Sequence, residues 1–150
     1  MRLGIKFWLC ICLLLLAGCG GEEPKRSAAA DLDPFADSPL IAWEAGDPAA
    51  GRALFEQKVL AAGAGCVTCH SLEPDVTLVG PSLYGVADRA QTRQSGVLAP
   101  NYLYLSIVAP DQHVVEGFAD DLMPETYATA LTEEQLANLV SFLMTLKGKE

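Results

Sequence analysis

Two cysteines and a histidine stand within one run of five residues, Cys66-Val67-Thr68-Cys69-His70. In this order the two sulfurs can add to the vinyl groups of a haem as thioethers, and the adjacent imidazole is then held beneath the porphyrin as an iron ligand. The motif therefore predicts one covalent haem c, attached through Cys66 and Cys69, with His70 as an iron ligand. It restricts the fold to one that can enclose a haem.

A C-x-x-C pair also occurs in zinc sites and in thioredoxin-type redox sites. Zinc requires four ligands, yet beyond the two cysteines of the motif the chain offers only His70 and His113, and Cys69 and His70 would clash at one tetrahedral ion because they are adjacent. A thioredoxin-like site would need a βαβ pattern, whereas the motif is flanked by Gly63-Ala64-Gly65 and by an acidic loop with proline. The sequence favours haem and leaves a zinc or dithiol site as the minor alternative.

The amino-terminal segment has the pattern of an export signal. A cationic start precedes an apolar run from Phe7 to Ala17, which is shorter than the roughly 20 residues that a membrane-spanning helix needs. Leu16-Ala17-Gly18-Cys19 resembles the bacterial lipobox, in which the cysteine is acylated and becomes the first mature residue. We expect residues 1–18 to be a lipoprotein signal peptide and Cys19 to be the lipidation site; an ordinary signal peptide cut nearby is the alternative.

The five cysteines are all assigned by these interpretations. Cys10 and Cys12 would leave with the signal, Cys19 would carry lipid, and the motif pair would carry haem, so no thiol remains for a disulfide. We therefore expect an exported protein that is membrane-anchored through Cys19, with its haem domain in the periplasm or on the extracytoplasmic face.

The remaining chain divides into a linker and one domain. Residues 19–46 are small, charged and interrupted by proline, and they show no helical or strand period. Phe35, Leu40, Ile41 and Trp43 are exceptions, and the sequence does not say whether they pack on the domain or on a partner. A chain of 150 residues has room for one domain, which we place at 47–150.

Two helices are predicted in the first part of this domain. Asp47-Pro48 supplies an N-cap and a proline at the first helical position, and Gly51, Leu54 and Phe55 then fall on one face. A second helix is expected to begin near Pro100-Asn101 and to stop before Pro110.

The carboxy-terminal helix has the clearest signals. Thr132 and Gln135 have the spacing of a capping box, and Leu131 and Leu136 stand at the hydrophobic staple positions. No alternating pattern of useful length indicates a strand, so we expect an all-α domain with long loops. The predicted buried stripe of this last helix is Leu136, Leu139, Val140, Leu143 and Leu146.

Taken together, these features resemble the class I monohaem cytochromes c of the membrane-anchored bacterial lipoprotein type, over roughly residues 47–146. Gly51 and Phe55 look like the family's glycine and aromatic residue on the first helix, and Leu139 and Phe142 look like its leucine and aromatic residue on the last. The resemblance implies a small all-α fold whose helices and loops wrap around one covalent haem.

The resemblance also implies the other contacts of the haem iron. Gly80-Pro81-Ser82-Leu83-Tyr84-Gly85 looks like the family loop in which a proline carbonyl accepts a hydrogen bond from the proximal histidine, which would be the role of Pro81. Leu122-Met123-Pro124 resembles the family's distal Met-Pro motif, and this makes Met123 the second iron ligand beside His70.

Other residues remain as competitors or additional contacts. Met144 lies inside the last helix, where a core residue is expected, and His113 lies in a polar loop, where an exposed histidine is expected. Tyr84, Arg89 and Arg93 are candidates to contact the haem propionates, with a solvated loop arginine as the alternative.

An iron with protein ligands on both faces has no free site for oxygen or peroxide, so the expected function is outer-sphere transfer of single electrons, without catalytic residues. We expect a mobile carrier or a cytochrome subunit of a respiratory or photosynthetic electron-transfer chain. The alternative is a haem enzyme or gas sensor in which Met123 dissociates to open the iron.

Charge indicates the kind of partner. The chain has a formal net charge of -9, and loss of residues 1–18 would remove two of its 10 basic residues and none of its 19 acidic ones, which gives -11. A surface of this sign repels acidic molecules and attracts basic ones. The expected partners are redox proteins with a basic docking surface or subunits of a membrane electron-transfer complex, and nucleic acid is not expected.

Overall fold

The computed structural model describes residues 42–61 and 63–149. The predicted signal peptide, the lipidation site Cys19 and most of the predicted linker lie outside these residues. Along the described chain the elements are η2 (Trp43–Ala45), α1 (Pro48–Phe55), β1 (Val59–Leu60), β2 (Gly63–Ala64), α2 (Cys66–Cys69), α3 (Val86–Arg93), α4 (Ala99–Val108), η3 (Pro110–Gln112), α5 (Tyr127–Ala130) and α6 (Glu133–Thr145).

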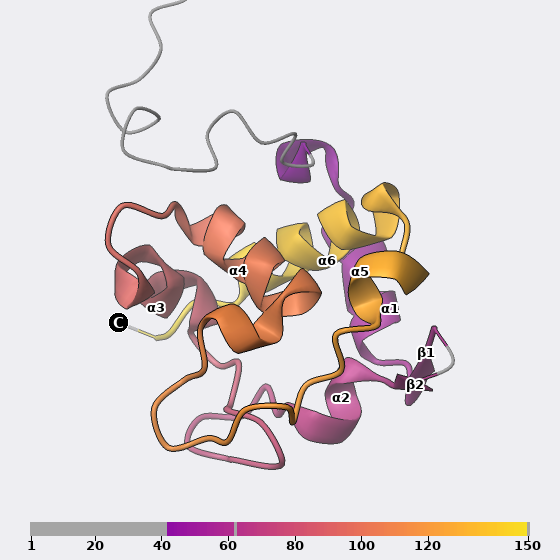
Figure 1. The fold of residues 1–150 in the computed structure, drawn as a ribbon. Coiled ribbons are helices and arrows are strands. Elements are labelled where there is room, and N and C mark those ends of the chain that lie inside the picture. The colour runs from indigo at the N-terminus through magenta and orange to yellow at the C-terminus, as the bar shows by residue number, and fades with distance from the viewer. Residues whose placement is uncertain (1–41, 62, 150) are drawn as a thin grey trace, which may run out of the picture.

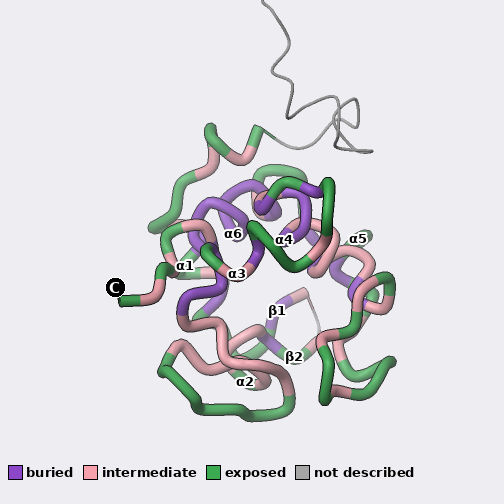
Figure 2. The backbone as a smooth tube through the Cα atoms, turned by 90° about the vertical axis from the view of Figure 1, so that its left-hand side faces the viewer, coloured by how far each residue is buried: buried purple, intermediate pink, exposed green. Residues whose placement is uncertain are grey.

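The helices α1, α4 and α6 form one side of the domain, and α2 lies on the opposite side with the loops that surround it (Figure 1). Buried residues concentrate along α4 and α6, whereas the loops near α2 are mostly exposed or half-buried (Figure 2). The two strands pair antiparallel, with Val59 opposite Ala64, and are too short to change the class of the fold. The all-α prediction is confirmed.

The caps predicted for the first and last helices are present. The Asp47 carboxylate accepts a hydrogen bond from the Ala49 amide at 2.8 Å, which satisfies one of the amides left without a partner at a helix start. In the capping box of α6, the Gln135 amide donates to the Thr132 hydroxyl at 3.2 Å and the Thr132 amide donates to the Gln135 side chain at 2.9 Å. Both helices therefore begin at the residues whose capping side chains predict their start.

The contact between α1 and α6 depends on Gly51. A Cβ atom at this position would lie 1.9 Å from the carbonyl oxygen of Asn138 and 2.8 Å from the Cβ of Phe142, so the backbones approach more closely than any side chain would allow. The rings of Phe55 and Phe142 then pack with their centroids 5.5 Å apart. Burying these aromatic rings against each other is a large part of what holds the two helices together.

The last residues of the predicted linker, 42–46, lie in the described part of the chain. Residues 42–46 pack on α6: the Ser141 hydroxyl donates to the Trp43 carbonyl, and the Asp47 amide donates to the Asn138 side-chain oxygen at 2.6 Å. A Cβ on Gly46 would lie 2.4 Å from the Ala137 carbonyl oxygen. We call residues 42–46 the strap. Its sequence has no helical period and so predicts a linker, because the polar side chain that holds it, Ser141, belongs to α6.

The middle helix α4 is confirmed, but α3 and α5 were not predicted. Residues 80–85 form a loop, as their glycines and proline predict, and helix α3 begins directly after it at Val86. Its N-cap is Gly85, with φ of +64° and no side-chain cap, so no Ser, Thr, Asp or Asn marks its start in the sequence. Helix α5 is a single turn without a side-chain cap, and such short elements have no period to detect.

Within the described residues, no helix is long and apolar enough to cross a membrane.

Candidate functional site

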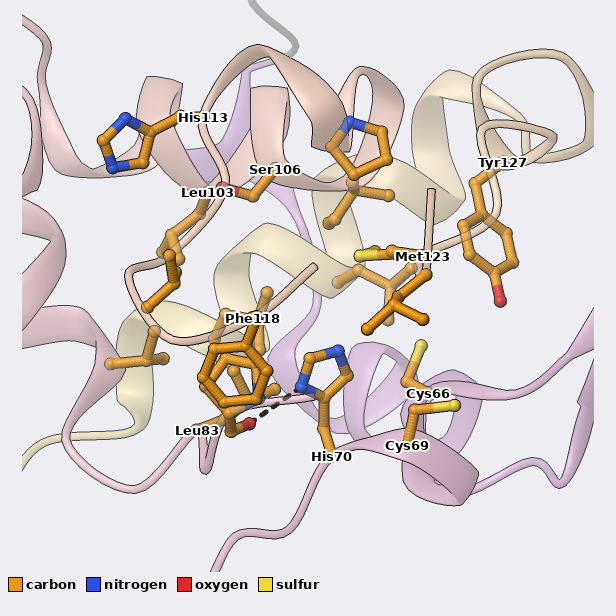
Figure 3. Close-up of a pocket in the computed structure, with 18 of the residues that line it drawn as sticks. Cys66, Cys69, His70, Leu83, Leu103, Ser106, His113, Phe118, Met123 and Tyr127 are labelled. Atoms are coloured by element: carbon orange, nitrogen blue, oxygen red, sulfur yellow. Dashed lines mark hydrogen bonds between the residues drawn. The ribbon is translucent and has the colours of Figure 1, made fainter. Parts of the chain in front are cut away.

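The attachment motif forms one helical turn, α2, directly after the β1–β2 hairpin. The His70 amide closes the turn by donating to the Cys66 carbonyl at 2.9 Å, and the Thr68 hydroxyl donates to the Gly65 carbonyl at 2.6 Å. This turn places the sulfur atoms of Cys66 and Cys69 beside the His70 ring at one cavity (Figure 3). Burial raises the pKa of the Cys66 thiol above its ordinary value, which keeps it a neutral thiol at pH 7 before any reaction.

The His70 ring is held in one orientation and one tautomer. Its Nδ1 lies 2.9 Å from the Pro81 carbonyl oxygen, and because a carbonyl can only accept, Nδ1 carries the proton and donates. The lone pair of the neutral ring is then on Nε2, where a metal could bind. Burial lowers the pKa of His70 below its ordinary value, more strongly than the Pro81 hydrogen bond raises it, so the ring is neutral at pH 7.

Gly80 supplies the space for this ring. A Cβ at Gly80 would lie 2.5 Å from Cε1 of His70, so any larger residue would push the ring away from the cavity. The predicted pairing of His70 with Pro81 is thus present, and the neighbouring glycine makes it possible.

The cavity has a volume of about 180 Å³, whereas a single buried water needs roughly 10–15 Å³ on the same scale. Protein interiors hold few voids larger than a water molecule, so a space of this size in a small domain indicates a ligand. Side chains from α1, β1, α3, α4 and α6 make its walls apolar, among them Phe55, Leu60, Val86, Leu103, Ile107 and Leu139. Apolar walls, two thiols and an available imidazole nitrogen fit a haem.

Met123 reaches this cavity from the loop between η3 and α5. Its side chain approaches the space from the side opposite His70 (Figure 3), and it is half-buried against the hydrophobic core. Met144 also packs against the core but does not line the cavity. Of the two methionines in the described chain, only Met123 is placed to face His70.

His113 lines a more distant part of the cavity wall. In Figure 3 it lies well apart from Met123, and its ring packs edge-on against Tyr102 with centroids 5.5 Å apart. This contact with Tyr102 explains the position of the His113 ring without binding to iron. The loop histidine predicted to be exposed is therefore half-buried instead.

Arg89 is fixed at the cavity wall by two backbone carbonyls. Its guanidinium donates to the Ser82 carbonyl at 2.7 Å and to the Tyr84 carbonyl, and Arg93 also lines the cavity. Burial, and then the charge of Arg93, lower the pKa of Arg89 from its ordinary value. Within the described residues neither arginine forms an ion pair with a carboxylate, so the two cations would be stabilised by an anionic ligand such as a propionate.

Tyr84 is not brought to the cavity. It is absent from the lining residues, and its hydroxyl accepts a hydrogen bond from the Lys149 amide at 2.9 Å. The candidate propionate contact of Tyr84 is therefore not supported by its position. The sequence pattern predicts the loop that contains Tyr84 but not the direction of the Tyr84 side chain.

Two aromatic residues of the site were missed in the sequence. Phe118 and Tyr127 line the cavity on either side of Met123 in the chain. Their only sequence signal is an isolated aromatic side chain in a polar segment.

Within residues 42–61 and 63–149, no three His, Cys, Asp or Glu side chains gather to hold a metal ion. This leaves the zinc alternative without a ligand set in the described part of the chain.

A family model described as Cytochrome c matches residues 48–147, which span α1 through α6 and include both the attachment motif and Met123. No curated protein matches the chain.

Proposed function

This chain belongs to the cytochrome c family and is a haem-containing electron carrier, and we propose from this premise that it holds one haem c between His70 and Met123. The observation that carries the proposal is the placement of these two side chains on opposite sides of one apolar cavity, beside the attachment cysteines. When bound, the haem supplies an iron that exchanges one electron between its ferric and ferrous states.

The chain's own residues have three tasks in this proposal. Pro81 keeps the proton of His70 on Nδ1 and so leaves Nε2 available as the ligand atom. The apolar walls exclude water, which lets a soft thioether such as Met123 stabilise the ferrous state. Arg89, anchored by the carbonyls of Ser82 and Tyr84, offers its remaining N–H groups to a propionate.

Mass spectrometry of the denatured protein tests this function. We expect one added haem per chain, because the chain contains a single C-x-x-C-H, and an alkaline pyridine spectrum typical of thioether-linked haem. Replacing both Cys66 and Cys69 by serine is the matched control and should abolish covalent attachment. An unmodified mass for protein made in cells that assemble c-type haem would contradict the proposal.

We further propose that the protein is tethered at the extracytoplasmic face of a membrane through Cys19. The support is the lipobox-like sequence that ends at this cysteine. A single acyl chain gives only marginal membrane binding, whereas two chains anchor a protein firmly, because each buried CH₂ contributes about 0.8 kcal/mol.

The substitution Cys19→Ser should move the haem protein from the membrane fraction to the soluble fraction or block its processing. Fractionation followed by haem staining measures this. Tight membrane binding of a processed Cys19→Ser variant would point instead to another subunit.

Within this proposal the redox partner has a basic docking surface and belongs to a respiratory or photosynthetic chain. The strongly negative formal charge supports a basic partner, since complementary charge accelerates encounter by about 10 to 10³-fold at low salt. Screening acts over about 8 to 10 Å at physiological ionic strength.

The second-order rate of electron exchange with a basic redox protein should therefore fall steeply as salt is raised. Exchange with a strongly acidic redox protein should instead become faster. Stopped-flow absorbance at several ionic strengths measures both rates. Rates that do not depend on salt would indicate a domain permanently docked in a larger complex.

A further inference from the structure

The segment that carries Met123 is weakly held by its own backbone. Among the residues that the structure describes, Leu122, Met123 and Pro124 have no hydrogen-bond partner. The nearest attachment before Met123 is an exposed one, between the Asp121 amide and the Asp111 carboxylate at 3.1 Å. Segments with few buried contacts open locally at low free energy.

Tyr127 is the exception in this segment. Between Pro110 and Leu131, a stretch that the structure describes completely, it is the only buried residue, with 4% of its surface exposed. Its ring lines the cavity four residues after Met123. Within this stretch Tyr127 is therefore the most deeply buried attachment to the core, beside the half-buried Met123.

The Tyr127 hydroxyl reaches a segment that is distant in the sequence. It donates a hydrogen bond to the Ala64 carbonyl, which lies in β2 two residues before Cys66. One bond thus joins the segment of Met123 to the segment that carries the attachment cysteines, across 63 positions of sequence. Burial raises the pKa of Tyr127 above its ordinary value, so the phenol stays protonated and able to donate.

We propose that Tyr127 is a positioning residue that holds the Met123 segment closed over the cavity through its hydrogen bond to Ala64. This inference rests on the proposed role of Met123 as an iron ligand. Tyr127 itself does not touch the iron; it sets the fraction of molecules in which the sulfur of Met123 is in place. A competing ligand binds only the open fraction, so its apparent affinity reports that fraction directly.

The test compares Tyr127→Phe with the wild type and with Tyr84→Phe, all in the haem-loaded form. Tyr127→Phe keeps the buried ring and removes only the hydroxyl. Tyr84→Phe is a matched control, because it also removes a tyrosine hydroxyl bonded to a backbone group, the Lys149 amide, away from the cavity. Imidazole binding to the ferric protein and carbon monoxide binding to the ferrous protein are measured, with thermal unfolding as the measure of overall stability.

We expect Tyr127→Phe to bind imidazole on the order of tenfold more tightly than the wild type, the change that loss of one hydrogen bond produces, while Tyr84→Phe binds it as the wild type does. Equal imidazole and carbon monoxide binding in all three proteins would overturn the inference. The inference would also be overturned if both variants bound imidazole more tightly than the wild type, each by an amount that follows its loss of thermal stability.

The wild type separates this inference from the proposed function. If the wild type already binds imidazole as readily as Met123→Ala, Met123 is not the iron ligand and both proposals fall. If the wild type resists imidazole and Met123→Ala does not, the ligand assignment stands, and the result for Tyr127→Phe decides the inference alone.

Discussion

Replacing Met123 by alanine should abolish the weak far-red absorption band of the ferric protein that arises from sulfur bound to iron. Removal of the soft thioether should also lower the reduction potential, because that ligand favours ferrous iron. Carbon monoxide should bind the reduced variant at least about 100-fold more tightly than the wild type, since no ligand of the chain then competes for the open face. Optical spectra, redox titration and carbon monoxide binding measure the three effects.

Met144→Leu is the matched control for this prediction. Met144 packs against the same core but does not line the cavity, so its loss should leave the band, the potential and carbon monoxide exclusion unchanged. The opposite pattern would make Met144 the ligand. A wild-type protein that binds carbon monoxide readily at neutral pH would favour a gas sensor or haem enzyme over an electron carrier.

Gly51→Ala should reduce the free energy of unfolding by about 3 kcal/mol, the upper range for overpacking a well-filled contact. The added Cβ would lie 1.9 Å from the carbonyl oxygen of Asn138, and a helix backbone cannot yield locally, so α1 and α6 must separate. Alanine is intrinsically better than glycine inside a helix by about 1 kcal/mol, but the clash outweighs this preference. The loss is a large share of the roughly 5–15 kcal/mol that stabilise a domain.

Urea unfolding of the haem-loaded protein measures this change, and Gly63→Ala is its control. A Cβ at Gly63 would meet only the Leu60 carbonyl oxygen at 3.6 Å, which is ordinary contact, so this variant should unfold close to the wild type. A Gly51→Ala protein with wild-type stability would show that α1 and α6 can separate at little cost.

The elements that were predictable from the sequence have signals within a few residues of each other. Asp47-Pro48 and the Thr132–Gln135 pair satisfy helix-end amides locally, so their helices begin where the residues stand. The spacing of Cys66, Cys69 and His70 is local in the same way. Each of these features depends on interactions between residues that are close together in the sequence.

What could not be predicted depends on contacts between distant residues. Ser141 holds the strap and Asn138 holds Asp47 directly after it, and each partner is more than 90 positions away. The hydrogen bond of Tyr127 to Ala64 is also long-range, and helix α3 is stabilised by burial of Val86 and Ala90 against the core rather than by a cap. Sequence periodicity cannot detect such partners.

The strap also determines which contacts of the domain would bear a force applied to the amino terminus. In Figure 1 the indigo turn η2 lies at the end of the domain opposite α2, and the hydrogen bonds that hold residues 43 and 47 pass any load to α6. The force would therefore be borne by the α1–α6 contact and not by the loops around His70 and Met123. Under the anchor proposed at Cys19, the cysteine motif in α2 would lie at the end of the domain away from the point of attachment. With the anchor proposed at Cys19, thermal motion of the domain would bring that end near neighbouring proteins while the loops around His70 and Met123 bear no load.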